Sequence, residues 1–256
     1  MYRPAWLYRM YERKVLRQLA RTDAIPHHVG VITDGNRRWA REFGTTTAHG
    51  HQAGANKIIE FLGWCSELGI SVVTLYVLSK ENLTRDESEL GPLKRIISNL
   101  VDQIADTESY AVKLVGDLRL LPDDLRRELA AAQQRTPATG RARLTVNVAV
   151  GYGGREEIVD AVKSWMRSSQ AAGLSMQQMI DDLTPERISE HLYTKGQPDP
   201  DLIIRTSGEQ RLSGFMMWQS AYSEFYFCEV YWPDFRRTDF LRAVRDFSSR
   251  GRRYGK

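Results

Sequence analysis

Short apolar, β-prone runs alternate with longer stretches of helical periodicity along this chain, and this alternation constrains the fold more than any other feature. The runs are nearly unbroken in apolar residues, as expected of strands that are covered on both faces. A regular order of strand and helix favours parallel strands joined by helical crossovers. The sequence therefore predicts an α/β fold with a central, mostly parallel sheet covered by helices.

The pattern also places the elements along the chain. Predicted strands, rich in branched apolar residues, cover 27–33, 71–78, 112–115, 143–150 and 202–205. Helices, recognised by apolar residues three and four positions apart, are predicted around 55–65, 93–104, 123–134, 155–169 and 240–247. Neither a repeat nor a linker divides the sequence. Residues 23–256 are therefore predicted to form a single domain.

Residues 1–22 are predicted to form an additional N-terminal helix, with Pro4 suited to its first turn. Apolar side chains recur at four-residue spacing, at Leu7, Tyr11, Val15 and Leu19, while arginines lie on another face. We favour packing of this stripe on the domain or on a second subunit, because the stripe is short and the polar side includes Glu12. The alternative is a basic amphipathic helix that rests on a membrane surface.

Composition narrows the classes of function. Apolar content is 42% and charged content 27%, which are ordinary values for a soluble globular enzyme. The arginine-rich N-terminus lacks the apolar core of a secretory signal, and Cys65 and Cys228 are expected to be reduced and buried. A cytoplasmic protein is therefore expected, peripheral at the inner face of the membrane if the first helix contacts lipid. The net charge of +4 suits an anionic ligand, but the arginines form no nucleic-acid-binding pattern, and nucleic acid is not expected as a partner.

Polar or glycine residues stand where apolar runs stop, at 34–36, 79–82, 151–155 and 205–213. In open parallel sheets, ligands bind beyond the carboxyl ends of the strands. Asp34 ends the first run, and a carboxylate there either holds Mg²⁺ or caps the following helix. Asn36, Arg37 and Arg38 add donors and positive charge beside it, so a diphosphate bound through a metal would use the whole group.

Two further groups of polar residues have both a binding and a structural interpretation. Arg205, Arg211 and Ser213 could clamp a diphosphate, or the arginines could form a surface ion-pair network with Glu209; these weigh about equally. The second group is formed by His51, Ser79, Glu81, Asn82 and Arg85. It could bind a ligand, but helix caps and hydrogen-bonded turns use the same residue types. Phosphate-loop, dinucleotide-binding and nucleophile-elbow motifs are absent, which removes support for nucleotide cofactors and for serine hydrolases.

Taken in order, these segments resemble the cis-prenyltransferase family, whose best-known members are undecaprenyl diphosphate synthases. The resemblance runs from about His28 to the C-terminus, and the ordered set of motifs is highly specific. The matching segments are His28–Ala40, Gly50–Gly54, Ser79–Arg85, Gly151–Arg155, Ile204–Arg211, Trp232–Phe235 and Arg253–Gly255. Three positions depart from the family pattern: Thr47 replaces an arginine, Leu83 a tryptophan and Gly151 an asparagine. Arg37 could replace the missing arginine.

The resemblance implies a homodimeric enzyme that uses Mg²⁺ to condense isopentenyl diphosphate with an allylic diphosphate. It implies that the growing chain lies in a hydrophobic tunnel, and that Arg253–Gly255 reach the partner subunit's site. The implied metal ligands are Asp34 and Glu224, and the implied catalytic residues are Asp34 and Asn82. The candidate substrate-binding residues are Gly35, Asn36, Arg37, Arg38, Trp39, His51, Leu78, Ser79, Arg85, Arg205, Arg211 and Ser213.

The product is predicted to be short. Leu78 would lie close to the diphosphates and block a growing tail early, since packed interiors tolerate little extra volume. Similarity to short-chain actinobacterial members favours one condensation on geranyl diphosphate, giving (2Z,6E)-farnesyl diphosphate. The alternatives are a long-chain decaprenyl or undecaprenyl diphosphate synthase, a branched head-to-middle coupling enzyme and a non-catalytic partner subunit. A phosphatase with an aspartate nucleophile is a further rival, but Asn36 stands where its second aspartate is usual.

Overall fold

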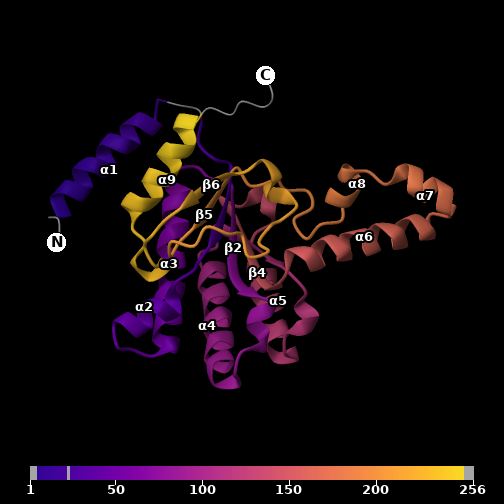
Figure 1. Cartoon of the computed structure of the whole chain (residues 1–256), viewed down its shortest axis with the longest axis horizontal. Coiled ribbons are helices and arrows are strands. Elements are labelled where there is room, and N and C mark those ends of the chain that lie inside the picture. Colours follow the sequence, from indigo (N-terminus) through magenta and orange to yellow (C-terminus); the bar gives the residue numbers. More distant parts are fainter. Residues whose placement is uncertain (1–4, 22–23, 251–256) are drawn as a thin grey trace.

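The computed structural model describes residues 5–21 and 24–250 (Figure 1). The strands are β1 (His28–Ile32), β2 (Val72–Ser79), β3 (Tyr110–Val115), β4 (Leu144–Tyr152), β5 (Leu202–Arg205) and β6 (Glu224–Phe227). The α-helices are α1 (Ala5–Leu19), α2 (Asn36–Glu42), α3 (Thr47–Glu67), α4 (Glu87–Ala105), α5 (Asp123–Arg135), α6 (Gly154–Ala171), α7 (Met176–Asp182), α8 (Pro185–Ser189) and α9 (Arg237–Arg250). The five predicted strands and the predicted helices are confirmed, whereas α2, β6, α7 and α8 were not among the predicted elements.

The six strands form one sheet in the order β3-β4-β2-β1-β5-β6, and every pairing is parallel. All residues of β1, β4 and β5 are buried, which explains why these strands read as unbroken apolar runs. In the central register, Ile32 of β1 faces Tyr76 of β2 on one side and Arg205 of β5 on the other. The carboxyl ends of these three strands therefore meet at one edge of the sheet.

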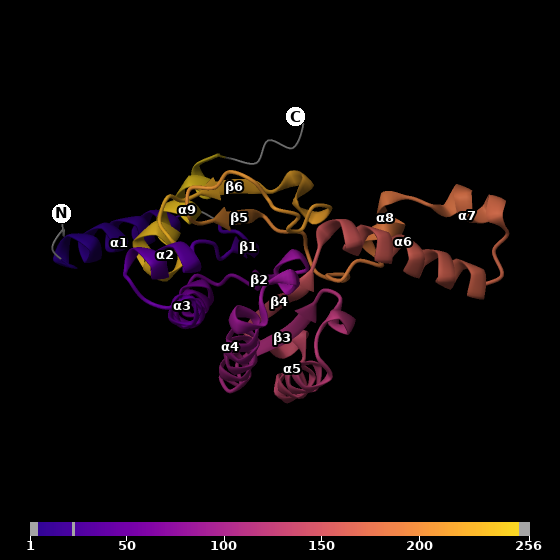
Figure 2. The ribbon, with the colours of Figure 1, turned by 60° about the horizontal axis from the view of Figure 1, so that its bottom comes forward.

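The main core lies on the face of the sheet that is covered by α3, α4, α5 and α9. Its centre is aromatic: Phe61 of α3 packs edge-on against Trp232 and against Phe240 of α9. The opposite face carries a smaller cluster, in which Phe215 stacks on Tyr76. From this side α6, α7 and α8 project as an arm away from the body (Figure 2). The sheet is thus held firmly from one side, and the less covered side leaves room at the strand ends.

The N-terminal helix packs on the domain, as favoured from the sequence. Val15 and Leu19 are buried against α9, and the Thr238 hydroxyl donates a hydrogen bond of 3.0 Å to Glu12. The Arg245 guanidinium donates one of 2.8 Å to the Tyr11 hydroxyl. Within residues 5–21 and 24–250, no helix is long and apolar enough to cross a membrane. Pro4 and the Arg253–Gly255 motif lie outside the described residues.

Candidate active site

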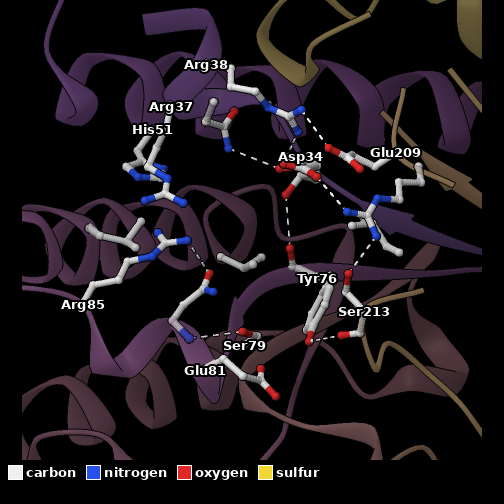
Figure 3. Close-up of a pocket in the computed structure, with 18 of the residues that line it drawn as sticks. Asp34, Arg37, Arg38, His51, Tyr76, Ser79, Glu81, Arg85, Glu209 and Ser213 are labelled. Carbon is white, nitrogen blue, oxygen red and sulfur yellow. Dashed lines mark hydrogen bonds and ion pairs between the residues drawn. The ribbon is translucent and has the colours of Figure 1, made fainter. Parts of the chain in front are cut away.

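A cavity of about 740 Å³ opens at the carboxyl ends of β1, β2 and β5. Asp34 follows β1, Ser79 ends β2 and Arg205 ends β5, and all three line the cavity. Two groups of cations face it in Figure 3, with Arg38 beside Asp34 on one side and Arg37 and Arg85 on the other. A cavity at this position, with this charge, suits an anionic ligand.

Asp34 is the carboxylate at the floor of the cavity, and it is held by two arginines. Its Oδ2 accepts a hydrogen bond of 2.8 Å from Arg205, and its Oδ1 lies 3.2 Å from a guanidinium nitrogen of Arg38. Burial by itself raises the pKa of Asp34, but the hydrogen bond and charge of Arg205, with the charge of Arg38, bring the pKa below its usual value. Asp34 is therefore ionised at neutral pH.

The turn after Asp34 requires glycine. Gly35 has a φ of 106°, and a Cβ there would lie 2.8 Å from the Tyr231 ring. The chain then enters α2, which crosses α3 closely. A Cβ at Gly54 would lie 2.4 Å from the Asn36 side-chain oxygen, and one at Gly50 would lie 2.3 Å from the Asn36 carbonyl oxygen. Gly50 and Gly54 therefore allow α2 to pack closely against α3.

Arg205 is the buried centre of the second anion-binding group. Its guanidinium donates to Asp34, to the Ser213 hydroxyl at 2.9 Å and to the Arg211 carbonyl oxygen. Tyr76 supports the same loop by donating its hydroxyl to the Ser213 carbonyl at 3.2 Å. Burial raises the pKa of Tyr76 to about 12, so the hydroxyl keeps its proton.

Arg211 is exposed and pairs with Glu209, which also accepts a hydrogen bond of 3.0 Å from Arg38. The ion-pair network with Glu209 is therefore present, whereas the clamping of a diphosphate by these residues stays a prediction.

Glu89 is the shared partner of the third group, beyond the end of β2. It accepts hydrogen bonds from Arg85 at 2.9 Å and from His51 at 3.5 Å, and it lies 3.7 Å from Arg37. Arg85 also donates to the Asn82 side-chain oxygen at 2.9 Å. Burial lowers the pKa of His51, and the charges of Arg85 and Arg37 lower it further against the opposing effect of Glu89. His51 is therefore neutral at neutral pH and can accept a hydrogen bond.

The cavity wall becomes apolar at Ile32, Val77 and Leu93. Tyr76 pairs with Ala149 and Leu78 with Val150, so Val77 is an extra residue in β2 at a β-bulge. The bulge brings Val77 to the wall, whereas Leu78 is fully buried in the main core. The site thus combines a cationic end for phosphates with an apolar end for a hydrocarbon.

Comparison with known proteins agrees with this combination. Residues 32–255 match the family described as "Putative undecaprenyl diphosphate synthase". The chain belongs to the cis-prenyltransferase family. It is therefore an enzyme that transfers prenyl groups, and divalent-metal dependence is general in this family.

Individual relatives of this prenyltransferase are similar over nearly their full length. A (2Z,6E)-farnesyl diphosphate synthase of Mycolicibacterium smegmatis is 53% identical over 252 residues, covering 97% of this chain and 95% of the relative. A short-chain Z-isoprenyl diphosphate synthase of Mycobacterium bovis is 52% identical, covering 98% and 96%. Among solved structures, lavandulyl diphosphate synthase from Lavandula x intermedia, in complex with dimethylallyl diphosphate, superposes with a TM-score of 0.83 at 33% identity. That match covers 91% of this chain and all of the lavandulyl enzyme's chain.

Most of the predicted site residues of the prenyltransferase meet in this cavity. The predicted residues that line it are Asp34, Gly35, Asn36, Arg37, Arg38, His51, Ser79, Asn82, Arg85, Arg205, Arg211 and Ser213. Glu81 and Glu209, which the sequence analysis had named without a substrate-binding role, also line it, and the residues it did not single out for the site are Ile32, Thr33, Arg41, Tyr76, Val77 and Leu93. Arg41 could have been found, because it lies one helical turn after Arg37 on the same face of α2.

Three predicted residues do not line the cavity. Leu78 belongs to the core, as described, and Trp39 stacks on His49, at a centroid distance of 5.9 Å, and on Phe43. Glu224 is the first residue of β6 and pairs with Leu202, whereas Arg205 pairs with Phe227 at the other end of that strand. Three residues of parallel strand separate the two ends by about 10 Å. The Glu224 carboxylate instead accepts a hydrogen bond of 2.9 Å from Arg250. Within one chain the two carboxylates therefore lie at opposite ends of the strands, and a metal-binding role for Glu224 stays a prediction.

Two departures from the family pattern have physical explanations. Gly151 has a φ of 62°, in the left-handed region that glycine and asparagine tolerate best. Glycine can therefore replace asparagine there. Arg37 lines the cavity and Thr47 does not, which agrees with Arg37 as the replacement for the missing arginine.

Asp34 fits a Mg²⁺ site in which the protein supplies one carboxylate and the substrate phosphates and water supply the other oxygen ligands. Within the described parts of the chain, no group of three or more His, Cys, Asp or Glu side chains could hold a metal ion by itself. Mg²⁺ is commonly bound through one or two carboxylates, with substrate phosphates and water completing its octahedron. One ionised carboxylate between arginines, in a cavity large enough for diphosphates, agrees with metal that binds together with substrate.

Proposed function

We propose that this prenyltransferase condenses isopentenyl diphosphate with geranyl diphosphate, giving (2Z,6E)-farnesyl diphosphate and free diphosphate. The observation that carries the proposal is the ionised Asp34 between Arg38 and Arg205, in a cavity whose wall is apolar at Ile32, Val77 and Leu93. The relatives from Mycolicibacterium smegmatis and Mycobacterium bovis, named for short Z-prenyl products, support the same reaction.

The two diphosphates would occupy the two sides of Asp34. Arg205, Arg211 and Ser213 form the acceptor side, where a buried fork and an exposed guanidinium would bind isopentenyl diphosphate. Asn36, Arg38 and the backbone after Gly35 form the donor side for the allylic diphosphate. Arg37 and Arg85 add positive charge there, held in place by Glu89.

The chemistry follows from where charge develops. The allylic C–O bond breaks, its electron pair leaves with the diphosphate, and positive charge forms on the allylic carbon. Bound Mg²⁺ would supply a positive charge beside the departing diphosphate. Arg38 aims its guanidinium group at the same place and favours the transition state over the substrate. The double bond of isopentenyl diphosphate then attacks, and loss of a proton forms the Z double bond. Asn82, whose amide oxygen is fixed by Arg85, would orient the acceptor.

Product length would depend on the apolar end of the cavity. Val77 and Leu93 contact the space that a growing tail would enter, and Leu78 supports Val77 from the core. We expect a fifteen-carbon chain to fill this space. The hydrophobic tunnel and the blocking role of Leu78 remain predictions.

We also propose that the enzyme is a homodimer in which residues 23–256 are the catalytic domain and 1–22 an N-terminal helix. Support comes from β6, an edge strand on which Phe225 and Phe227 stack, and from Tyr222 beside it, which is 82% exposed. Exposed apolar side chains of this size and proximity are typical of subunit interfaces. Light scattering of wild type and of Phe227→Arg tests this: a monomeric wild type contradicts it, and a monomeric variant supports this edge as the contact.

The activity is tested by incubating the protein with labelled isopentenyl diphosphate, Mg²⁺ and geranyl, farnesyl or dimethylallyl diphosphate, followed by chromatography of the dephosphorylated products. A single fifteen-carbon Z product from the geranyl donor is expected. A ladder of long products would instead indicate a long-chain synthase. A branched ten-carbon product from dimethylallyl diphosphate alone would indicate head-to-middle coupling. No product with any donor would indicate a non-catalytic subunit.

A further inference from the structure

The two faces of α1 differ in character. The inner face is fixed to α9 through Val15, Leu19 and the hydrogen bond between Glu12 and Thr238. The outer face points away from the body, and α1 lies at the periphery of the molecule in both views (Figures 1 and 2). The sequence had set packing and membrane contact against each other as alternatives. Because packing uses only one face, the other face is free for a second contact.

The outer face of α1 is basic and carries no acidic side chain. Its exposed cations are Arg13, Lys14 and Arg17, followed by Arg21 just after the helix. Within residues 5–21 and 24–250, none of these four pairs with a carboxylate within 4 Å. Glu12, the one acidic residue of α1, points inward to α9. Four unpaired cations on one face attract a surface of fixed negative charge.

The same face carries large apolar side chains toward its N-terminal end. Trp6 is 57% exposed and Met10 is 61% exposed, and at 100° per residue both lie on the side of Arg13 and Arg17. Trp side chains are enriched at the boundary between lipid headgroups and acyl chains. Arginine and lysine can lay their stems along that boundary while their charges contact headgroups. An acidic protein surface would attract the cations but gives no reason for the exposed Trp and Met.

We propose that the outer face of α1, formed by Trp6, Met10, Arg13, Lys14, Arg17 and Arg21, docks the enzyme on an anionic phospholipid surface. The helix lies in the plane of the interface, with its apolar end at the acyl boundary and its cations on the headgroups. Docking leaves the catalytic cavity unchanged, since none of these side chains lines it. This inference stands independently of the proposed reaction.

Each cation near an anionic membrane contributes about 1 kcal/mol to binding, which corresponds to about a fivefold change in the partition coefficient. The double variant Arg13→Gln/Arg17→Gln is therefore expected to bind about 25-fold more weakly. The matched control is Arg127→Gln/Arg167→Gln, which removes the same charge from exposed positions on α5 and α6. Trp6→Ala/Met10→Ala tests the apolar part without a change of charge.

The experiment is cosedimentation of the full chain with phosphatidylcholine vesicles that do or do not contain phosphatidylglycerol. Wild type and the control are expected to bind the anionic vesicles and to be released by high salt, whereas both α1 variants bind weakly. Thermal unfolding and activity on water-soluble substrates should be unchanged in both variants. Equal vesicle binding by wild type and the Arg13/Arg17 variant would overturn the proposal. So would absent vesicle binding together with a change of oligomeric state in the α1 variants, since this face would then contact a second copy of the chain.

Discussion

Arg205 and Arg211 offer a sharp test of the proposed acceptor clamp, because they differ in burial but share a proposed ligand. The Arg205 side chain is 4% exposed and its fork donates to Asp34, Ser213 and the Arg211 carbonyl at once. The Arg211 side chain is 62% exposed and pairs only with Glu209 among the described residues. Replacing each by lysine keeps its charge but removes the planar fork.

The expected effects differ by more than a factor of ten. A lysine at 205 cannot present a two-pronged fork to a phosphate, and the loss of two charge-assisted hydrogen bonds to the bound diphosphate would cost about 1.5 kcal/mol each. The sum, about 3 kcal/mol, corresponds to roughly a 150-fold loss in kcat/KM. Arg211→Lys weakens an exposed contact of about 0.2–1 kcal/mol, a change of a few-fold at most.

Initial rates of incorporation of labelled isopentenyl diphosphate at a saturating donor concentration give both values of kcat/KM. Thermal unfolding of each variant checks that it is folded at the assay temperature. An Arg205→Lys variant that keeps a third or more of wild-type kcat/KM would refute the clamp. A larger loss in Arg211→Lys than in Arg205→Lys would refute the assignment of the buried fork as its centre.

Three further predictions concern other parts of the molecule. Gly54→Ala should raise KM for the allylic donor and lower the free energy of unfolding by about 1–3 kcal/mol, because its Cβ would displace Asn36. Gly63→Ala on the same helix meets nothing within 4 Å and should be neutral or stabilising in urea titrations. Burial lowers the pKa of His28 from 6.5 to about 4, so the neutral form is favoured in the folded state. The free energy of unfolding should fall by up to about 3 kcal/mol as pH drops from 6.5 to 4, a loss that urea titrations of His28→Asn should not show. Leu93→Ala should lengthen the product beyond fifteen carbons, and an unchanged product would show that Leu93 does not close the cavity.

The sequence was sufficient to predict those strands and helices whose residue pattern has a single physical cause. The strand at Leu202–Arg205 was predicted with its observed bounds, because a fully buried strand admits only apolar residues until it ends at a charged one. Strand β6 was missed because its residues are half-buried or exposed and its aromatic residues resemble those of the neighbouring core segment. Edge strands lack the strong pattern of central ones, since only part of their surface is covered.

The site was predictable to the extent that strand ends determine it. Asp34, Ser79 and Arg205 meet because parallel strands bring their carboxyl ends together. Glu224 does not line the cavity for the same reason, since a residue that begins a parallel strand lies at the opposite end of the strands. Leu78 does not line the cavity because a bulge interrupts alternation, and nothing in the local sequence marks Val77 as the extra residue.

The position of β5 beside β1 has a consequence for how the chain folds during its synthesis. The contacts that form the anion site join Asp34 to Arg205 and Arg38 to Glu209, pairs separated by 171 residues. A nascent chain that ends before β5 can pair β1 with β2 and β2 with β4 but contains only one half of the site. Substrate therefore has no affinity for the incomplete chain and stabilises only the finished one, by mass action on the folded state. Added isopentenyl diphosphate should then affect the refolding step in which β5 docks beside β1, and it should leave the earlier refolding steps unchanged.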